Sequence, residues 1–104
     1  MAPPLSPHTR QLVEVFFSSK DRSEASHWLE EECGNTLPSC GQQNEYGMER
    51  SRFAAIQLSK GDLHKLLDAI DEARMDCRDV LMAADFGFDV NAHEEWAEEV
   101  LRKT

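Results

Sequence analysis

The sequence lacks the motifs that identify the commonest nucleotide-binding and hydrolytic enzymes. It contains no G-x-x-x-x-G-K-[ST] loop, no G-x-G-x-x-G turn and no G-x-S-x-G nucleophile elbow. It also has no apolar run of the length that a transmembrane helix requires, and it opens without the basic and apolar segments of a secretory signal. These absences favour a non-catalytic protein in the cytoplasm, without membrane contact.

Basic residues are also scarce. Eleven Lys and Arg stand against 20 Asp and Glu, which gives a formal net charge of −9. Nucleic-acid binding requires clustered Lys and Arg, so we expect no direct nucleic-acid contact. The acidic residues are concentrated in residues 21–49 and 79–104, with seven in each segment. Such asymmetry favours a basic protein partner.

Cysteine is limited to Cys33, Cys40 and Cys77, an odd number without a C-x-x-C pair. This pattern is typical of free thiols in a reducing compartment rather than of a disulfide framework. His27 together with Cys33 and Cys40 is an alternative set of zinc ligands, but the spacings match no familiar finger or ribbon. We therefore predict no metal and no cofactor.

The 104 residues are 40% apolar and include eight aromatic side chains, enough for the core of one domain over 1–104. Apolar residues recur with helical spacing, and no segment alternates with period two. The sequence therefore predicts an all-α fold, a compact bundle of five to six short helices without a sheet. We expect residues 1–6 to be mobile and residues 34–47, which have no period and three glycines, to form a loop.

Local signals predict where these helices begin. Ser6 followed by Pro7 predicts the first start, and Asp21 with Glu24 three residues later is typical of a capping box. A third helix is expected over 48–58. By the same spacing Ser59 with Asp62 predicts the next start.

Two further signals concern the C-terminal half. The capping pattern recurs at Asp76, although the apolar stripe continues in phase beyond it, and we favour a break or kink there over one long helix. Asn91 with Glu94 predicts the start of the last helix, whose acidic residues come early and whose basic residues come late, as the helix dipole favours.

Arg74 falls near the middle of an apolar stripe, where a guanidinium must reach solvent or pair with a carboxylate. We favour an ion pair between helices over a ligand-binding arginine. His64 and Asp68, one turn apart, could form a proton-transfer pair, but a solvated helix face explains them better. Polar and aromatic residues also occur near the last helices, where they could line a ligand pocket or contact a partner protein. These candidate residues are Arg74, Arg78, Asp79, His93, Glu94 and Trp96.

Three segments carry a resemblance to known proteins. Residues 52–63 (RFAAIQLSKGDL), 78–86 (RDVLMAADF) and 93–96 (HEEW) resemble a group of small uncharacterised bacterial proteins. The resemblance implies a compact, cytosolic, stand-alone domain. It implies no activity, cofactor or catalytic residue.

Two hypotheses of function follow. The first is a protein–protein interaction module, monomeric or homodimeric by itself, that uses the acidic segments 21–33 and 91–103, with Trp96 and the loop over 34–47 as candidate anchors. The alternative is a small ligand-binding domain or enzyme with a polar pocket between the C-terminal helices.

Overall fold

A computed structural model describes residues 5–32, 45–86 and 91–103 of the chain, without the side chains of 45–48, 77 and 78. These residues form five helices and contain no strand, so the predicted all-α fold is confirmed. In chain order the helices are α1 (Pro7–Phe16), α2 (Ser19–Glu32), α3 (Glu45–Ser59), α4 (Leu63–Ala83) and α5 (Ala92–Lys103). None of them is long and apolar enough to cross a bilayer.

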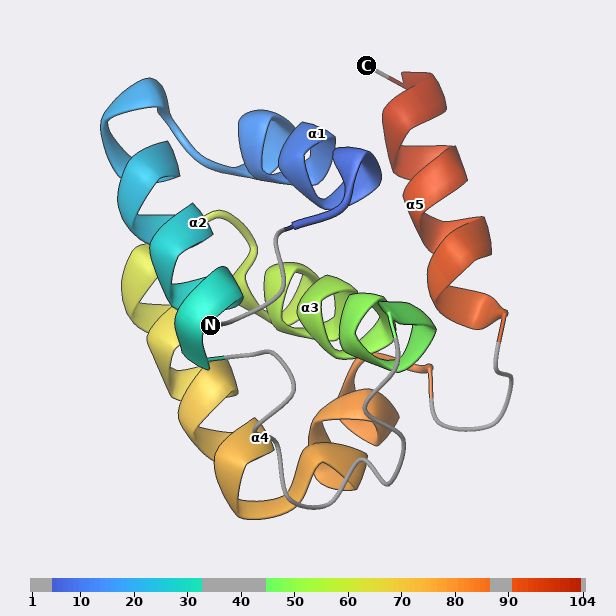
Figure 1. The fold of residues 1–104 in the computed structure, drawn as a ribbon. Coiled ribbons are helices and arrows are strands. Elements are labelled where there is room, and N and C mark those ends of the chain that lie inside the picture. The colour runs from blue at the N-terminus through green and yellow to red at the C-terminus, as the bar shows by residue number, and fades with distance from the viewer. Residues whose placement is uncertain (1–4, 33–44, 87–90, 104) are drawn as a thin grey trace.

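Helix α3 lies at the centre of the bundle (Figure 1). It contacts α1, α4 and α5, while α2 packs against α1 and α4. The apolar stripes of all five helices meet in one core, in which burial of each large side chain contributes about 1.5–3 kcal/mol. Its largest apolar members are Leu12, Phe17, Leu29, Phe53, Ile56, Leu66, Ile70 and Phe86.

The start of α1 agrees with the local signal. Ser6 is the N-cap, its Oγ accepts a hydrogen bond from the Thr9 backbone N–H at 3.2 Å, and Pro7 occupies the first helical position. The predicted start of α2 is wrong by three residues, because Ser18 precedes the helix and its carbonyl accepts from Asp21 and Arg22. Asp21 therefore lies in the first turn of α2, where its negative charge interacts favourably with the positive end of the helix dipole.

Helix α3 begins earlier than predicted, so Glu45 to Gly47 are helical rather than part of a loop, while residues 33–44 lie outside the described chain. The predicted helix start at Ser59 is wrong, because Ser59 is the last residue of α3. The Ser59 hydroxyl donates to the Ile56 carbonyl at 2.6 Å, within the last turn of α3, and the chain then reverses direction.

Asp62, not Ser59, is the N-cap of α4. Its Oδ1 accepts hydrogen bonds from the backbone N–H groups of His64 at 2.8 Å and Lys65 at 3.2 Å. Between the two helices Gly61 adopts φ +86°, and a Cβ placed there would lie 2.5 Å from the Phe16 carbonyl oxygen. The turn therefore requires glycine both for its backbone and for its close approach to the end of α1.

The predicted break at Asp76 is confirmed as a kink within α4. Asp76 has φ −156° and ψ 100°, an extended conformation that divides α4 into two helical segments. The last helix also begins where predicted: Asn91 precedes α5, and its carbonyl accepts from the N–H groups of Glu94 and Glu95. Figure 1 shows the bend of α4 beneath α3.

Three arginines bind backbone carbonyls at helix ends. Arg22 of α2 donates to Glu14 at 2.9 Å and Phe17 at 3.1 Å, where α1 ends. Arg52 of α3, which is 3% exposed, donates to Leu29 at 3.1 Å and to Glu30 at 3.4 Å, in the last turn of α2. The last four carbonyls of an α-helix generally lack an intrahelical donor, so an arginine there can supply one and places a positive charge at the negative end of the helix dipole.

The third arginine, Arg50 of α3, makes the same kind of contact with a later segment of the chain. It donates to the carbonyl of Phe86, just beyond the end of α4. Helix α3 thus holds both α2 and the segment after α4 through arginine side chains.

Candidate functional site

The structure places the two described polar candidates of α4 at the surface. Arg74 pairs with Glu32 of α2, its Nη1 lying 3.3 Å from Oε2, and lies 3.9 Å from Asp71. The favoured ion pair between helices is therefore observed, and it joins α4 to α2. Asp79, beyond the kink, is exposed, and the side chain of Arg78 lies outside the described residues.

His93 and Trp96 instead anchor α5 to the core. His93 is fully buried, and its ring meets Phe53 edge-on at a centroid distance of 5.4 Å and Phe86 at 6.2 Å. Trp96 is half-buried, with ring centroids 5.7 Å from both Phe16 and Phe86. These contacts fix the rotation of α5 and determine which of its side chains face solvent.

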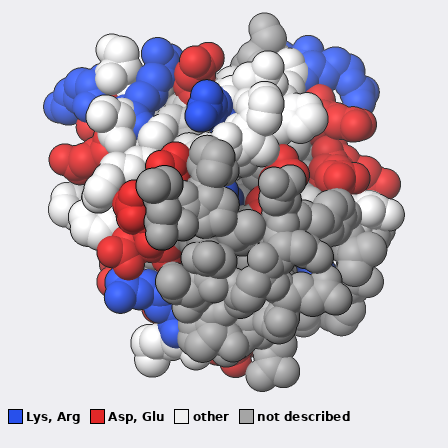
Figure 2. Space-filling view, viewed as in Figure 1, with Lys and Arg blue, Asp and Glu red and all other residues white. Residues whose placement is uncertain are grey.

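With that rotation, α5 presents one acidic face. The side chains of Glu94, Glu95, Glu98 and Glu99 are all exposed, and they fall within roughly 140° of the helix circumference at 3.6 residues per turn. Glu99 pairs with Lys103 at 3.1 Å. Figure 2 shows acidic side chains gathered along the edge of the molecule formed by α5. We call these four residues the α5 acidic face.

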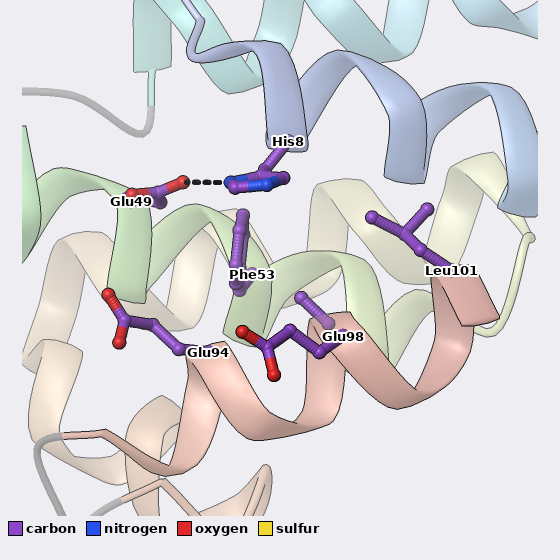
Figure 3. Close-up of a pocket in the computed structure, with 7 residues that line it drawn as sticks. His8, Glu49, Phe53, Glu94, Glu98 and Leu101 are labelled. Atoms are coloured by element: carbon purple, nitrogen blue, oxygen red, sulfur yellow. Dashed lines mark ion pairs between the residues drawn. The ribbon is translucent and has the colours of Figure 1, made fainter.

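A cavity of about 160 Å³ opens beside this face, between α1, α3 and α5. Apolar atoms of Phe53, Ala97 and Leu101 line its interior. Glu94 and Glu98 also line it, and Figure 3 shows them beside Phe53, with Leu101 further along α5. The cavity therefore combines an apolar wall with two carboxylates of the α5 acidic face.

The opposite side of the cavity carries a carboxylate that other side chains hold in place. Glu49 of α3 accepts a hydrogen bond from the Ser6 hydroxyl at 2.9 Å, and its side chain is 21% exposed. The Nδ1 atom of His8 lies 4.0 Å from the same Oε1 atom, which makes an ion pair when the imidazole is protonated (Figure 3). We call this space, lined by α1, α3 and α5, the acidic cavity.

The sequence predicts a pocket between the last helices, whereas the acidic cavity lies between α1, α3 and α5. Glu94 was among the candidates, and Glu98 belonged to the acidic segment 91–103. Glu49 and His8 were missed, because no local pattern predicts that the ends of two helices distant in sequence meet the middle of α5.

The remaining polar candidates have simpler surroundings. His64 and Asp68 are both exposed, as a solvated helix face requires. His27 is exposed and lies against Trp28 at a ring distance of 5.6 Å, while Cys33 and Cys40 lie outside the described residues. Within the described ranges, no three His, Cys, Asp or Glu side chains are arranged to hold a metal ion.

Exposed apolar side chains occur on α1 and α4. Val15 is 38% exposed, and Met75 and Met82, on either side of the kink, are 83% and 47% exposed. Single exposed hydrophobes are common on soluble proteins, so these residues alone define no site.

Comparison of the chain with protein-family models, with curated proteins and with solved structures gives no match.

Proposed function

We propose that this protein is a non-catalytic protein–protein interaction module of the cytoplasm and that its α5 acidic face binds a basic surface of another protein. The observation that carries the proposal is the geometry of α5. One side of the helix is anchored in the core by His93 and Ala97, and the other displays four exposed glutamates.

This arrangement supports binding in two ways. An anchored helix presents its charges in a fixed order, so little conformational entropy is lost when a partner docks. A surface of one sign also steers an oppositely charged partner and accelerates association. Glu94 and Glu95 lie in the first turn of α5, where the helix dipole stabilises their negative charge before any partner arrives.

The test begins with a photo-crosslinking residue at Glu95 and, as the control, at the exposed Glu72 of α4. We expect a discrete basic protein to crosslink to position 95 and not to position 72. The purified partner should then bind the wild-type chain with an affinity that falls as salt rises.

Neutralisation of the α5 acidic face provides the decisive comparison. We expect Glu→Gln at its four positions to weaken binding at least tenfold, because several charge pairs are lost together. The matched control carries four Glu→Gln or Asp→Asn changes at exposed positions of α1 and α4, outside both acidic segments, namely Glu14, Asp68, Asp71 and Glu72. Equal affinity of both variants for the partner would refute the assignment of α5 as the contact surface.

A further inference from the structure

We propose that the acidic cavity receives one lysine or arginine side chain of the basic partner. This inference rests on the proposed function and names the recognition element within it. The cavity opens directly beside the α5 acidic face, with which it shares Glu94 and Glu98.

The size of the cavity selects the class of occupant. Its volume of about 160 Å³ is close to the roughly 150 Å³ of an engineered cavity that binds benzene. Pockets for drug-sized ligands and cofactors occupy about 300–1,000 Å³. A single extended side chain matches this space, whereas a nucleotide or an organic cofactor exceeds it.

The lining selects the chemistry of that side chain. Phe53, Ala97 and Leu101 offer an apolar wall, which suits the methylene stem that lysine and arginine share. Carboxylates on two helices, Glu49 on α3 and Glu98 on α5, complement a cationic end group. A purely apolar side chain would form no ion pair with the carboxylates, and a short cation would not bury the apolar wall.

The carboxylate on α3 is preorganised for this role. The Ser6 hydroxyl donates to Glu49 Oε1 at 2.9 Å, and Ser6 is itself fixed as the N-cap of α1. Since Glu49 is held before binding, less side-chain entropy is lost when it meets a cation. Among the described residues that line the cavity, His8 is the one that can carry a positive charge, and it is 67% exposed.

The experiment separates stem length from charge. Two synthetic peptides of the same length and charge carry three basic residues spaced by glycine, either lysine or 2,4-diaminobutyrate, whose ammonium is two methylenes closer to the backbone. We expect the lysine peptide to bind the wild-type chain about fivefold more tightly in calorimetry, because the additional methylenes are partly buried against Phe53 and Leu101.

A variant that fills the cavity tests the location. Ala97→Met adds a flexible apolar side chain to the lining and retains every carboxylate. We expect it to remove the preference for lysine while both peptides still bind. Ser23→Met, in the shallow groove between α1 and α2, is the matched control and should retain the preference.

Amide chemical shifts of the wild-type chain give a readout that requires no substitution. With the lysine peptide, the largest changes should fall at Glu49, Phe53 and Glu98, and not at Ser23 or Ser26. Equal affinity for the two peptides, with shifts confined to the outer side of α5, would overturn the cavity proposal and leave the proposed function standing. Failure of both peptides to bind at low salt would count against both proposals.

Discussion

Replacement of Arg52 by methionine tests how the helix ends of this bundle are stabilised. The side chain is 3% exposed and donates to Leu29 at 3.1 Å and Glu30 at 3.4 Å. A hydrogen bond to a charged donor contributes about 1.5–3 kcal/mol, and the longer contact contributes less. Because methionine retains most of the stem volume, packing changes little. We expect the free energy of unfolding to fall by about 2–4 kcal/mol.

The matched control is Arg22→Met, which removes the same charge and two carbonyl contacts of similar length at the end of α1. Arg22 is only half-buried, so water can replace its hydrogen bonds, and the expected loss is about 1 kcal/mol or less. Urea denaturation followed by circular dichroism measures both losses. The Arg52 variant should also melt roughly 10–20 °C below the wild type. If it lost no more stability than the Arg22 variant, burial would not govern these contacts and the reasoning would fail.

Three further substitutions and one control test the turn, the α4 cap and a surface ion pair, each by thermal or urea denaturation. Gly61→Ala should destabilise by about 2–4 kcal/mol, because its backbone has φ +86° and its Cβ would meet a carbonyl oxygen at 2.5 Å; a loss below about 1 kcal/mol would mean that the turn adapts easily. Asp62→Ala should cost about 1 kcal/mol through loss of the α4 N-cap, and Asp68→Ala, in the same helix, close to nothing. Arg74→Ala should cost no more than about 0.5 kcal/mol despite its ion pair with Glu32, because the arginine is 52% exposed; a larger loss would indicate that this pair is more rigid than an ordinary surface contact.

Local sequence signals located helix ends well where a single candidate stood alone. Ser6 with Pro7 and Asn91 correctly predicted two starts, and Asp76 correctly predicted the kink. Each signal works because capping involves residues within one turn, which the sequence displays directly.

The predictions were wrong where two polar residues three positions apart competed for one cap. Asp21 and Ser59 both have the right chemistry, but Ser18 and Asp62 occupy the boundaries instead. The second choice depends on a tertiary contact, because the turn at Gly61 must fit against the end of α1. Such a contact is invisible to a local pattern.

The candidate site likewise has one part that local sequence patterns predict and one part that depends on tertiary contacts. The α5 acidic face follows from helical periodicity, since residues three and four apart share a side of a helix. The acidic cavity does not, because Glu49 and His8 reach it from helices that only the folded chain brings together. Periodicity likewise does not distinguish a pocket histidine from His93, which packs as an aromatic core residue near Phe53 and Phe86.

Because α3 lies at the centre of the bundle, the helices before it cannot complete their packing until α3 has been synthesised. Helices α1 and α2 are synthesised before the other helices that they pack against, namely α3 and α5 for α1 and α4 for α2. The hydrogen bonds from Arg52 to carbonyls in the last turn of α2 likewise form only after α3 has been synthesised. At roughly 5–20 residues per second, the N-terminal third spends a second or more without the helix that covers it. During synthesis α1 and α2 are therefore exposed to chaperones and proteases until the helices that cover them emerge.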